Sequence, residues 1–253
     1  MKRIFIMVCV LAIVLLSSIA QAHMLWLNAS NHYPNIGESV KIEVGWGHKF
    51  PKDEIIKKEW LKGIYALTPN GEKISLNRID DTHYTFTPNI SGSYIVAAFI
   101  KPGFLTKTTS GYKLQNKKGL KNAISCFNYD MRAKVVVQVG KDKKGLSQKA
   151  GHPLEIIPLF SPEMLNAGME LPLKVLFRNK PLSDVKVDAT YAGFSGKNHT
   201  AAYTIRTCNK GEAKIKILKK GHWMINVTNK FPYHDTEVCD DYQFNTTLTF
   251  EVR

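Results

Sequence analysis

The chain lacks the motifs that mark the common enzyme and zinc-site classes. Its four cysteines include no C-x-x-C pair, which argues against a thiolate zinc site. The H-E-x-x-H, G-x-S-x-G, P-loop and dinucleotide-binding fingerprints are missing, and no carboxylate pair stands out for glycoside hydrolysis. These absences favour a protein that is not an enzyme.

Acidic residues are scarce as well, with 21 Asp and Glu against 35 Lys and Arg, so the formal net charge is +14. Such a charge favours anionic partners in general. The lysines are nevertheless spread over separate clusters at 113–121, 141–149 and 214–220, as expected for solvated loops and strand edges. We therefore expect no nucleic-acid partner, particularly for a chain that is exported.

Long apolar runs are limited to one, Ile4–Leu16, which follows the basic residues Lys2 and Arg3. Small residues at Ala20 and Ala22 complete the pattern of a secretory signal peptide over residues 1–22. No second run approaches the ~20 residues of a membrane-spanning helix. The sequence thus predicts a periplasmic or secreted mature chain without a transmembrane span.

Cleavage after Ala22 makes His23 the first residue of the mature chain. A free N-terminal histidine offers an α-amine and an imidazole, with ordinary pKa values near ~8 and ~6.5, so both lose a proton to a metal at modest cost. Divalent transition metals are the natural partners of such a chelate. The alternative is that histidine follows the cleavage site by chance.

Convincing helix patterns are also scarce, and alternation of polar and apolar residues dominates, as in Ser39–Val44 and Thr246–Val252. Many short strands between turn signals predict an all-β protein made of two β-sandwich, immunoglobulin-like domains. The polar, basic segment 141–151 is typical of a linker. We expect an N-terminal domain at 23–140 and a C-terminal domain at 152–253.

The first two expected strands, His23–Asn28 and Ser39–His48, allow a prediction of register. An antiparallel pairing that sets residue i opposite residue 71 − i places Leu25 against Trp46 and Leu27 against Val44, which keeps one face apolar. The same register places His23 opposite His48. Two imidazoles and the α-amine then form a histidine brace, a three-nitrogen arrangement that suits Cu(II) and also Ni(II).

Other residues are weaker candidates. His83, in the turn Asp80–Tyr84, could add a ligand, although a solvated turn is the favoured explanation of it. His48 could also have a purely structural role in place of metal binding, because it follows Gly45–Gly47 and could cap a turn by hydrogen bonding to the backbone. Three cysteines remain in the mature chain, and in an oxidising compartment we expect Cys208 to pair with Cys239 and Cys126 to stay free.

Several segments together are similar to one known family. These are Ala22–Leu27, Gly45–Phe50, Pro153–Pro158, Ala189–Phe194, Lys219–Ile225 and the closing stretch from Cys239 to Val252. The chain resembles a bacterial exported family of unknown function whose members are often labelled periplasmic components of nickel or cobalt transport systems. The resemblance covers essentially the whole mature chain and implies export, a β-rich body and a link to nickel or cobalt uptake by an envelope transporter. It also carries over His23 and His48 as ligands. A departure is Cys208, where the family more often has an acidic residue.

Three functions follow as hypotheses. The first is a periplasmic transition-metal-binding protein for nickel or cobalt, with copper as a further candidate, that binds through His23. The second is a metal-free envelope interaction or glycan-binding module. The third is a copper histidine-brace enzyme that cleaves polysaccharides oxidatively.

Overall fold

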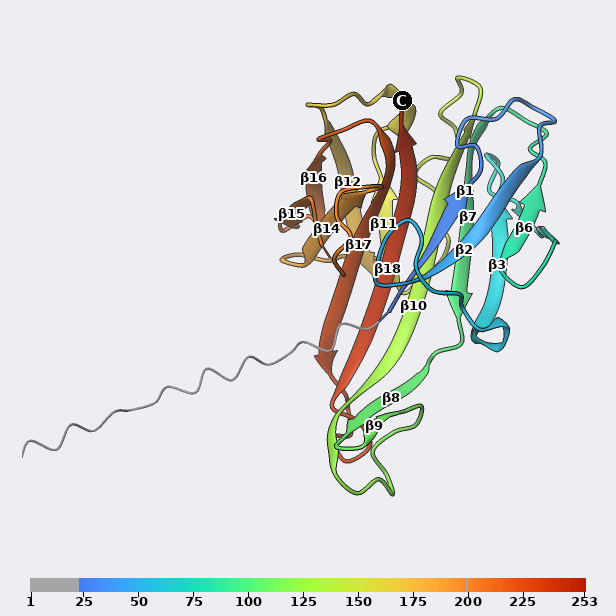
Figure 1. The fold of residues 1–253 in the computed structure, drawn as a ribbon. Coiled ribbons are helices and arrows are strands. Elements are labelled where there is room, and N and C mark those ends of the chain that lie inside the picture. The colour runs from blue at the N-terminus through green and yellow to red at the C-terminus, as the bar shows by residue number, and fades with distance from the viewer. Residues whose placement is uncertain (1–22, 199) are drawn as a thin grey trace, which may run out of the picture.

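The computed structural model describes residues 23–198 and 200–253, and the regular secondary structure of these residues is almost entirely β-strand (Figure 1). The all-β sandwich fold predicted from the alternating pattern is confirmed. The expected signal peptide, residues 1–22, lies outside the described residues. In the described ranges the helical segments are two short 3₁₀ turns, Lys58–Trp60 and Pro162–Met164. No helix there has both the length and the apolar character needed to span a membrane.

The described strands form three sheets. The first has the order β1-β2-β6-β5, with bounds β1 Met24–Ala29, β2 Val40–Gly47, β6 His83–Phe86 and β5 Asn77–Arg78. The second has the order β11-β12-β13, with β16 also paired to β12, and bounds β11 Leu154–Pro158, β12 Glu170–Phe177, β13 Lys180–Pro181 and β16 Glu212–Lys216.

The third sheet has ten strands, and both smaller sheets pack against it. Its main path runs β15 (Tyr203–Arg206), β14 (Lys186–Tyr191), β17 (Gly221–Pro232), β18 (Asp241–Val252), β10 (Ala123–Val139), β7 (Gly92–Ile100), β3 (Leu61–Leu67) and β4 (Lys73–Ile74). A hairpin of β8 (Gly103–Thr108) and β9 (Gly111–Lys113) extends it from β10.

Two hydrophobic cores lie between these layers. One core fills the space between β1, β2 and β6 and the β3-β7-β10 part of the large sheet. The other lies between the β11-β12-β16 sheet and the β14-β17-β18 part, with Ile95 and Val136 reaching it from the first half. The sequence pattern explains both cores, because each strand turns one side chain in two towards the opposing sheet.

The large sheet is continuous across the two cores, because β10 and β18 pair in parallel from Phe127 opposite Asp241 to Val135 opposite Thr249. Figure 1 shows β10 and β18 side by side through the centre of the molecule. The segment 141–151 between the halves is tied down, since the amide of Ser93 donates to Lys144 and Leu146 is buried in the second core. The domain boundary at this segment stays a prediction.

The large sheet also fixes the strand that begins at the expected mature N-terminus. The buried hydroxyls of Thr247 and Thr249 donate to the backbone carbonyls of Leu25 and Leu27, at 2.7 and 2.5 Å between oxygens. The outer edge of β1 is therefore hydrogen-bonded to side chains of β18, while its other edge pairs with β2. These contacts hold the start of β1, and with it His23, against the body of the protein.

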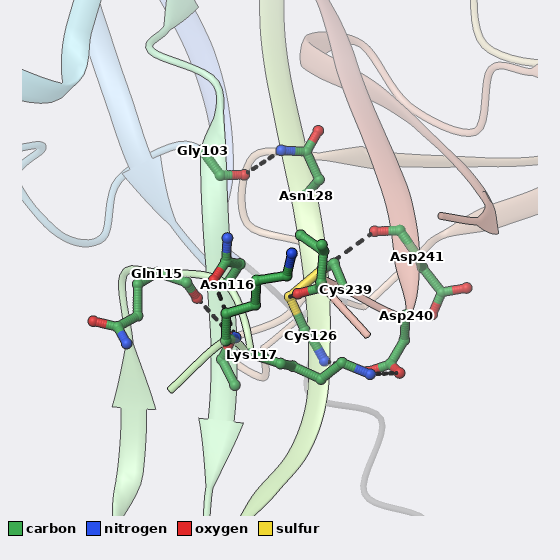
Figure 2. The surroundings of a disulfide bond; sticks show 12 residues. Gly103, Gln115, Asn116, Lys117, Cys126, Asn128, Cys239, Asp240 and Asp241 are labelled. Carbon is green, nitrogen blue, oxygen red and sulfur yellow. Dashed lines mark hydrogen bonds and ion pairs between the residues drawn. A yellow bond between two sulfur atoms is a disulfide. The ribbon is translucent and has the colours of Figure 1, made fainter. Parts of the chain in front are cut away.

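The disulfide expected between Cys208 and Cys239 is wrong. Cys239 is bonded to Cys126, with 5.0 Å between the Cα atoms (Figure 2). Cys208 is free and exposed. The cause is the parallel pairing of β10 with β18, because Cys126 immediately precedes the first paired residue, Phe127, and Cys239 lies two residues before its partner Asp241.

Candidate metal centre

The pairing of β1 with β2 follows the predicted register, with Leu25 opposite Trp46 and Leu27 opposite Val44. His23 directly precedes β1 and His48 directly follows β2, so the two histidines come together at the same end of the strand pair. Their ring centroids are 4.1 Å apart, and the His23 ring also stacks on Trp46 at 5.1 Å with planes 6° apart.

The loop that carries His48 is held by a carboxylate. Asp53 Oδ2 accepts hydrogen bonds from the backbone amides of His48 and Lys49 at 2.7 and 3.2 Å. Gly47 precedes them with φ of +129°, and a Cβ added there would lie 2.5 Å from Asp53 Oδ2. Glycine is therefore needed at position 47 both for the backbone conformation and for the close approach of Asp53.

A buried tryptophan, Trp26, contacts the same loop. Trp26 lies in a small apolar cluster with Met24, Phe50 and Met224, and its indole nitrogen donates to the carbonyl of Pro51 at 3.0 Å. Trp26 thus packs against Met224 of β17 in the large sheet, on the face of β1 opposite Leu25.

Glu54 is a third member of the site, which the sequence analysis did not identify. Its backbone amide donates to the Trp46 carbonyl at 3.0 Å in an isolated bridge, and its carboxylate oxygens lie 3.1 and 3.2 Å from His23 Nε2. The available signal was an acidic pair, Asp53 and Glu54, in a lysine-rich loop just after His48.

His23, His48 and Glu54 form the one group of three His, Cys, Asp or Glu side chains that could hold a metal among the described residues. One ligand atom from each lies within 4.8 Å of the others. Donor atoms on a common metal at ~2.0–2.1 Å are about 3–4 Å apart, so small side-chain rotations would close the set. Imidazole and carboxylate donors suit a borderline divalent ion such as nickel, cobalt, copper or zinc.

The electrostatics favour a neutral ring on His48. Partial burial lowers the pKa of His48, and the neighbouring His23 lowers it further, while the carboxylates of Glu54 and Asp53 act in the opposite direction. A metal ligand must present an unprotonated nitrogen, so a lowered pKa keeps His48 available at neutral pH.

His83 lies elsewhere. It begins β6, its Nδ1 is 2.8 Å from Asp80 Oδ2, and its Nε2 is 3.9 Å from Glu43. The structure therefore brings together two of the three expected ligands, His23 and His48, and leaves His83 in a separate contact with Asp80 and Glu43.

A largely apolar groove adjoins the two histidines. It has a volume of about 380 Å³, and His23 and His48 form part of its wall. Its remaining wall is aromatic and aliphatic, and includes Trp46, Trp60 and Met131. The groove reaches from the end of β2 to β9, so His23 and His48 face an apolar surface on one side.

These features define an all-β sandwich protein with a candidate metal centre at the start of its first strand. The chain belongs to the family described as Domain of unknown function (DUF4198), whose family model matches residues 20–230. No curated protein matches the chain.

Among solved structures, the chain is similar to the D0–D1 domain of intimin, with 13% identity over 89% of this chain and 97% of that one and a TM-score of 0.24. A DUF4785 family protein from Legionella pneumophila has 10% identity over 87% of this chain and 55% of that one, with a TM-score of 0.25. Fibronectin(III)-like modules of Clostridium thermocellum CbhA have 10% identity over 88% and 93%, with a TM-score of 0.20. Similarity at this level carries no argument about function.

Proposed function

We propose that the protein is an exported, periplasmic transition-metal-binding protein that holds nickel or cobalt, with copper as a further candidate. The observation that carries the proposal is the meeting of His23, His48 and Glu54, with ligand atoms within 4.8 Å of one another. We propose further that it serves metal uptake or handling together with an envelope transporter, which accords with the labels often given to the family it resembles.

Export adds a donor to this set. Cleavage after Ala22 converts the backbone nitrogen of His23 into an α-amine, so one residue supplies an amine and an imidazole. With His48 and Glu54, the mature chain then presents up to three nitrogen donors and one carboxylate. Such a set favours Ni(II) or Cu(II) over the oxygen-seeking ions Mg²⁺ and Ca²⁺.

The test is calorimetric titration of the processed protein with Ni(II), Co(II) and Cu(II), after mass spectrometry has confirmed a terminus at His23. We expect low-micromolar or tighter affinity for at least one ion. A Gly-Ser-Gly-Ser extension before His23 should weaken binding by at least about tenfold, because it moves the α-amine out of chelating reach of the His23 ring, and His48→Ala should do the same.

His83→Ala and His234→Ala are the matched controls, since each removes one histidine that lies outside the cluster. Both should bind the metal as the wild type does. Unchanged affinity in the protein extended by Gly-Ser-Gly-Ser would overturn the proposal, as would the absence of binding of all three ions.

A further inference from the structure

We propose that the groove beside His23 and His48 receives the apolar or aromatic body of a small organic chelator, so that the protein binds its metal as a ternary complex. The inference rests on the proposed function, because it assigns a ligand to the open side of that site. The ligand class is a compact molecule with metal-donor atoms at one end and an apolar surface at the other.

The first argument is the position of the groove. His23 and His48 border it directly, so a metal bound by these imidazoles would be within reach of a molecule in the groove. Two imidazoles and one carboxylate also leave positions free on an ion that takes five or six ligands, even when the α-amine is added. A donor group from the groove would complete the coordination shell.

The second argument is the chemistry of the walls. Among the described residues that line the groove, none is Lys, Arg, Asp or Glu. In a chain with net charge +14, this is a local exception. Aromatic faces such as Trp46 and Trp60 offer stacking surfaces, whereas a hydrated ion or a charged peptide would find few partners there.

The third argument is shape. Phe127 and Met131 of β10 line the groove and are only 7% and 4% exposed, so it has a buried wall. Tyr112 of β9 and Leu114, which directly follows β9, are 51% and 62% exposed and also line the groove. A volume of about 380 Å³ is within the ~300–1,000 Å³ of small-molecule sites. A concave site of this size favours a small ligand over the flat surface of a protein partner.

The experiment compares two bidentate nitrogen chelators, aromatic 2,2′-bipyridine and aliphatic ethylenediamine, on the processed protein loaded with one equivalent of Ni(II). Calorimetry measures each affinity, and equilibrium dialysis with elemental analysis measures whether Ni(II) stays on the protein. We expect bipyridine to bind without removing Ni(II) and about tenfold more tightly than ethylenediamine, because its rings bury apolar surface.

Two variants test the groove itself. Tyr112→Ser/Leu114→Ser removes apolar surface at exposed positions where folding should tolerate it, and it should abolish the preference for bipyridine while leaving affinity for Ni(II) alone within about twofold. Ile79→Ser/Leu218→Ser changes two exposed apolar residues, 57% and 44% exposed, that do not line the groove, and the preference should persist.

The outcomes separate the two proposals. Failure to bind Ni(II) alone would remove the nickel site and this inference with it. Binding of Ni(II) with equal affinities for the two chelators, or extraction of Ni(II) by bipyridine, would overturn only this inference. A monomer–dimer equilibrium abolished by Tyr112→Ser/Leu114→Ser, without chelator preference, would assign the groove to a second copy of the chain and would also overturn it.

Discussion

The carboxylate of Glu54 has a defined chemical task beside an N-terminal histidine. It lies 3.1 Å from His23 Nε2, and because a carboxylate accepts hydrogen bonds, this contact favours the tautomer with the proton on Nε2 and the lone pair on Nδ1. Nδ1 is the ring nitrogen nearer the backbone, and therefore the one that can chelate together with the α-amine. Glu54 thus either binds the metal itself or fixes the tautomer that does so, a role that commonly affects metal affinity.

Glu54→Gln tests this role with little change in shape. The backbone bridge to Trp46 does not depend on the carboxylate, so the fold should be preserved, and the side chain is half exposed. We expect metal affinity in calorimetry to fall by about 10–100-fold, the range seen when a group that orients a ligand is changed. Glu59→Gln, an exposed acid in the nearby 3₁₀ turn, is the control with the same change in charge. Equal affinities for the two variants would show that Glu54 acts only as a distant charge.

At the scale of elements, the sequence predicts the two histidines of the site because apolar positions fix the register of β1 and β2. Strand β2 alternates apolar residues with polar residues or glycine, and Leu25 and Leu27 of β1 share a core with Val44 and Trp46 of β2. A shift of one residue would therefore turn Leu25 and Leu27 away from that core. That constraint was enough to place His23 beside His48. Glu54 was missed because the loop between β2 and β3 has no periodicity, and its position depends on an isolated bridge to Trp46.

The long-range pairing of β10 with β18 was missed for a different reason. Parallel pairing between segments more than a hundred residues apart leaves no local pattern in either strand. Missing this pairing also led to the wrong disulfide. Cys208 and Cys239 are closer in sequence, but the pairing of β10 with β18 brings Cys126 next to Cys239. Pairings of this kind need the whole fold before they can be assigned.

The disulfide should stabilise this junction. It closes a sequence separation of 113 residues, and the adjoining loop is also tied by hydrogen bonds from the Cys126 amide to Asp240 at 2.6 Å and from the Lys117 amide to Val238 at 2.9 Å. We expect Cys126→Ala/Cys239→Ala to lower the free energy of unfolding by about 2–4 kcal/mol in urea titrations without reductant. Cys208→Ala should leave it unchanged. Stability that depends on Cys208 instead would contradict the pairing.

At the scale of the whole molecule, a pair of histidines, one buried and one partly buried, joins the two halves. His32 lies in the loop after β1 and His222 is the second residue of β17, and their ring centroids are 4.9 Å apart. His32 Nδ1 donates to the Val136 carbonyl at 2.9 Å, and the Nε2 atoms of both rings are buried without a hydrogen-bond partner among the described residues. In the described part of the chain, no carboxylate acts on either ring to compensate a positive charge, so both rings should remain neutral in the folded state.

This arrangement predicts acid sensitivity of the junction. Burial lowers the pKa of His32 to about 4 and that of His222 to about 3, and for His222 the charge of His32 adds to the effect. Below the ordinary value of ~6.5 the unfolded chain therefore binds protons that the folded chain does not, and the free energy of unfolding falls as the pH falls from 6.5 towards 4. Each ring contributes a slope of about 1.4 kcal/mol per pH unit in this window, and the contribution is absent above pH 7.

His222→Phe isolates one of these slopes, because phenylalanine fills the space beside Phe50 and His32 without a titrating group. Urea unfolding at pH 7.5, 5.5 and 4.5 should show a loss of stability on acidification that is smaller in His222→Phe by about 1.4 kcal/mol per pH unit. His234→Phe, at an exposed position, should follow the wild type. Parallel curves for wild type and His222→Phe would mean that the ring takes up its proton within the fold, and the junction would then have to admit water between the halves at mildly acidic pH.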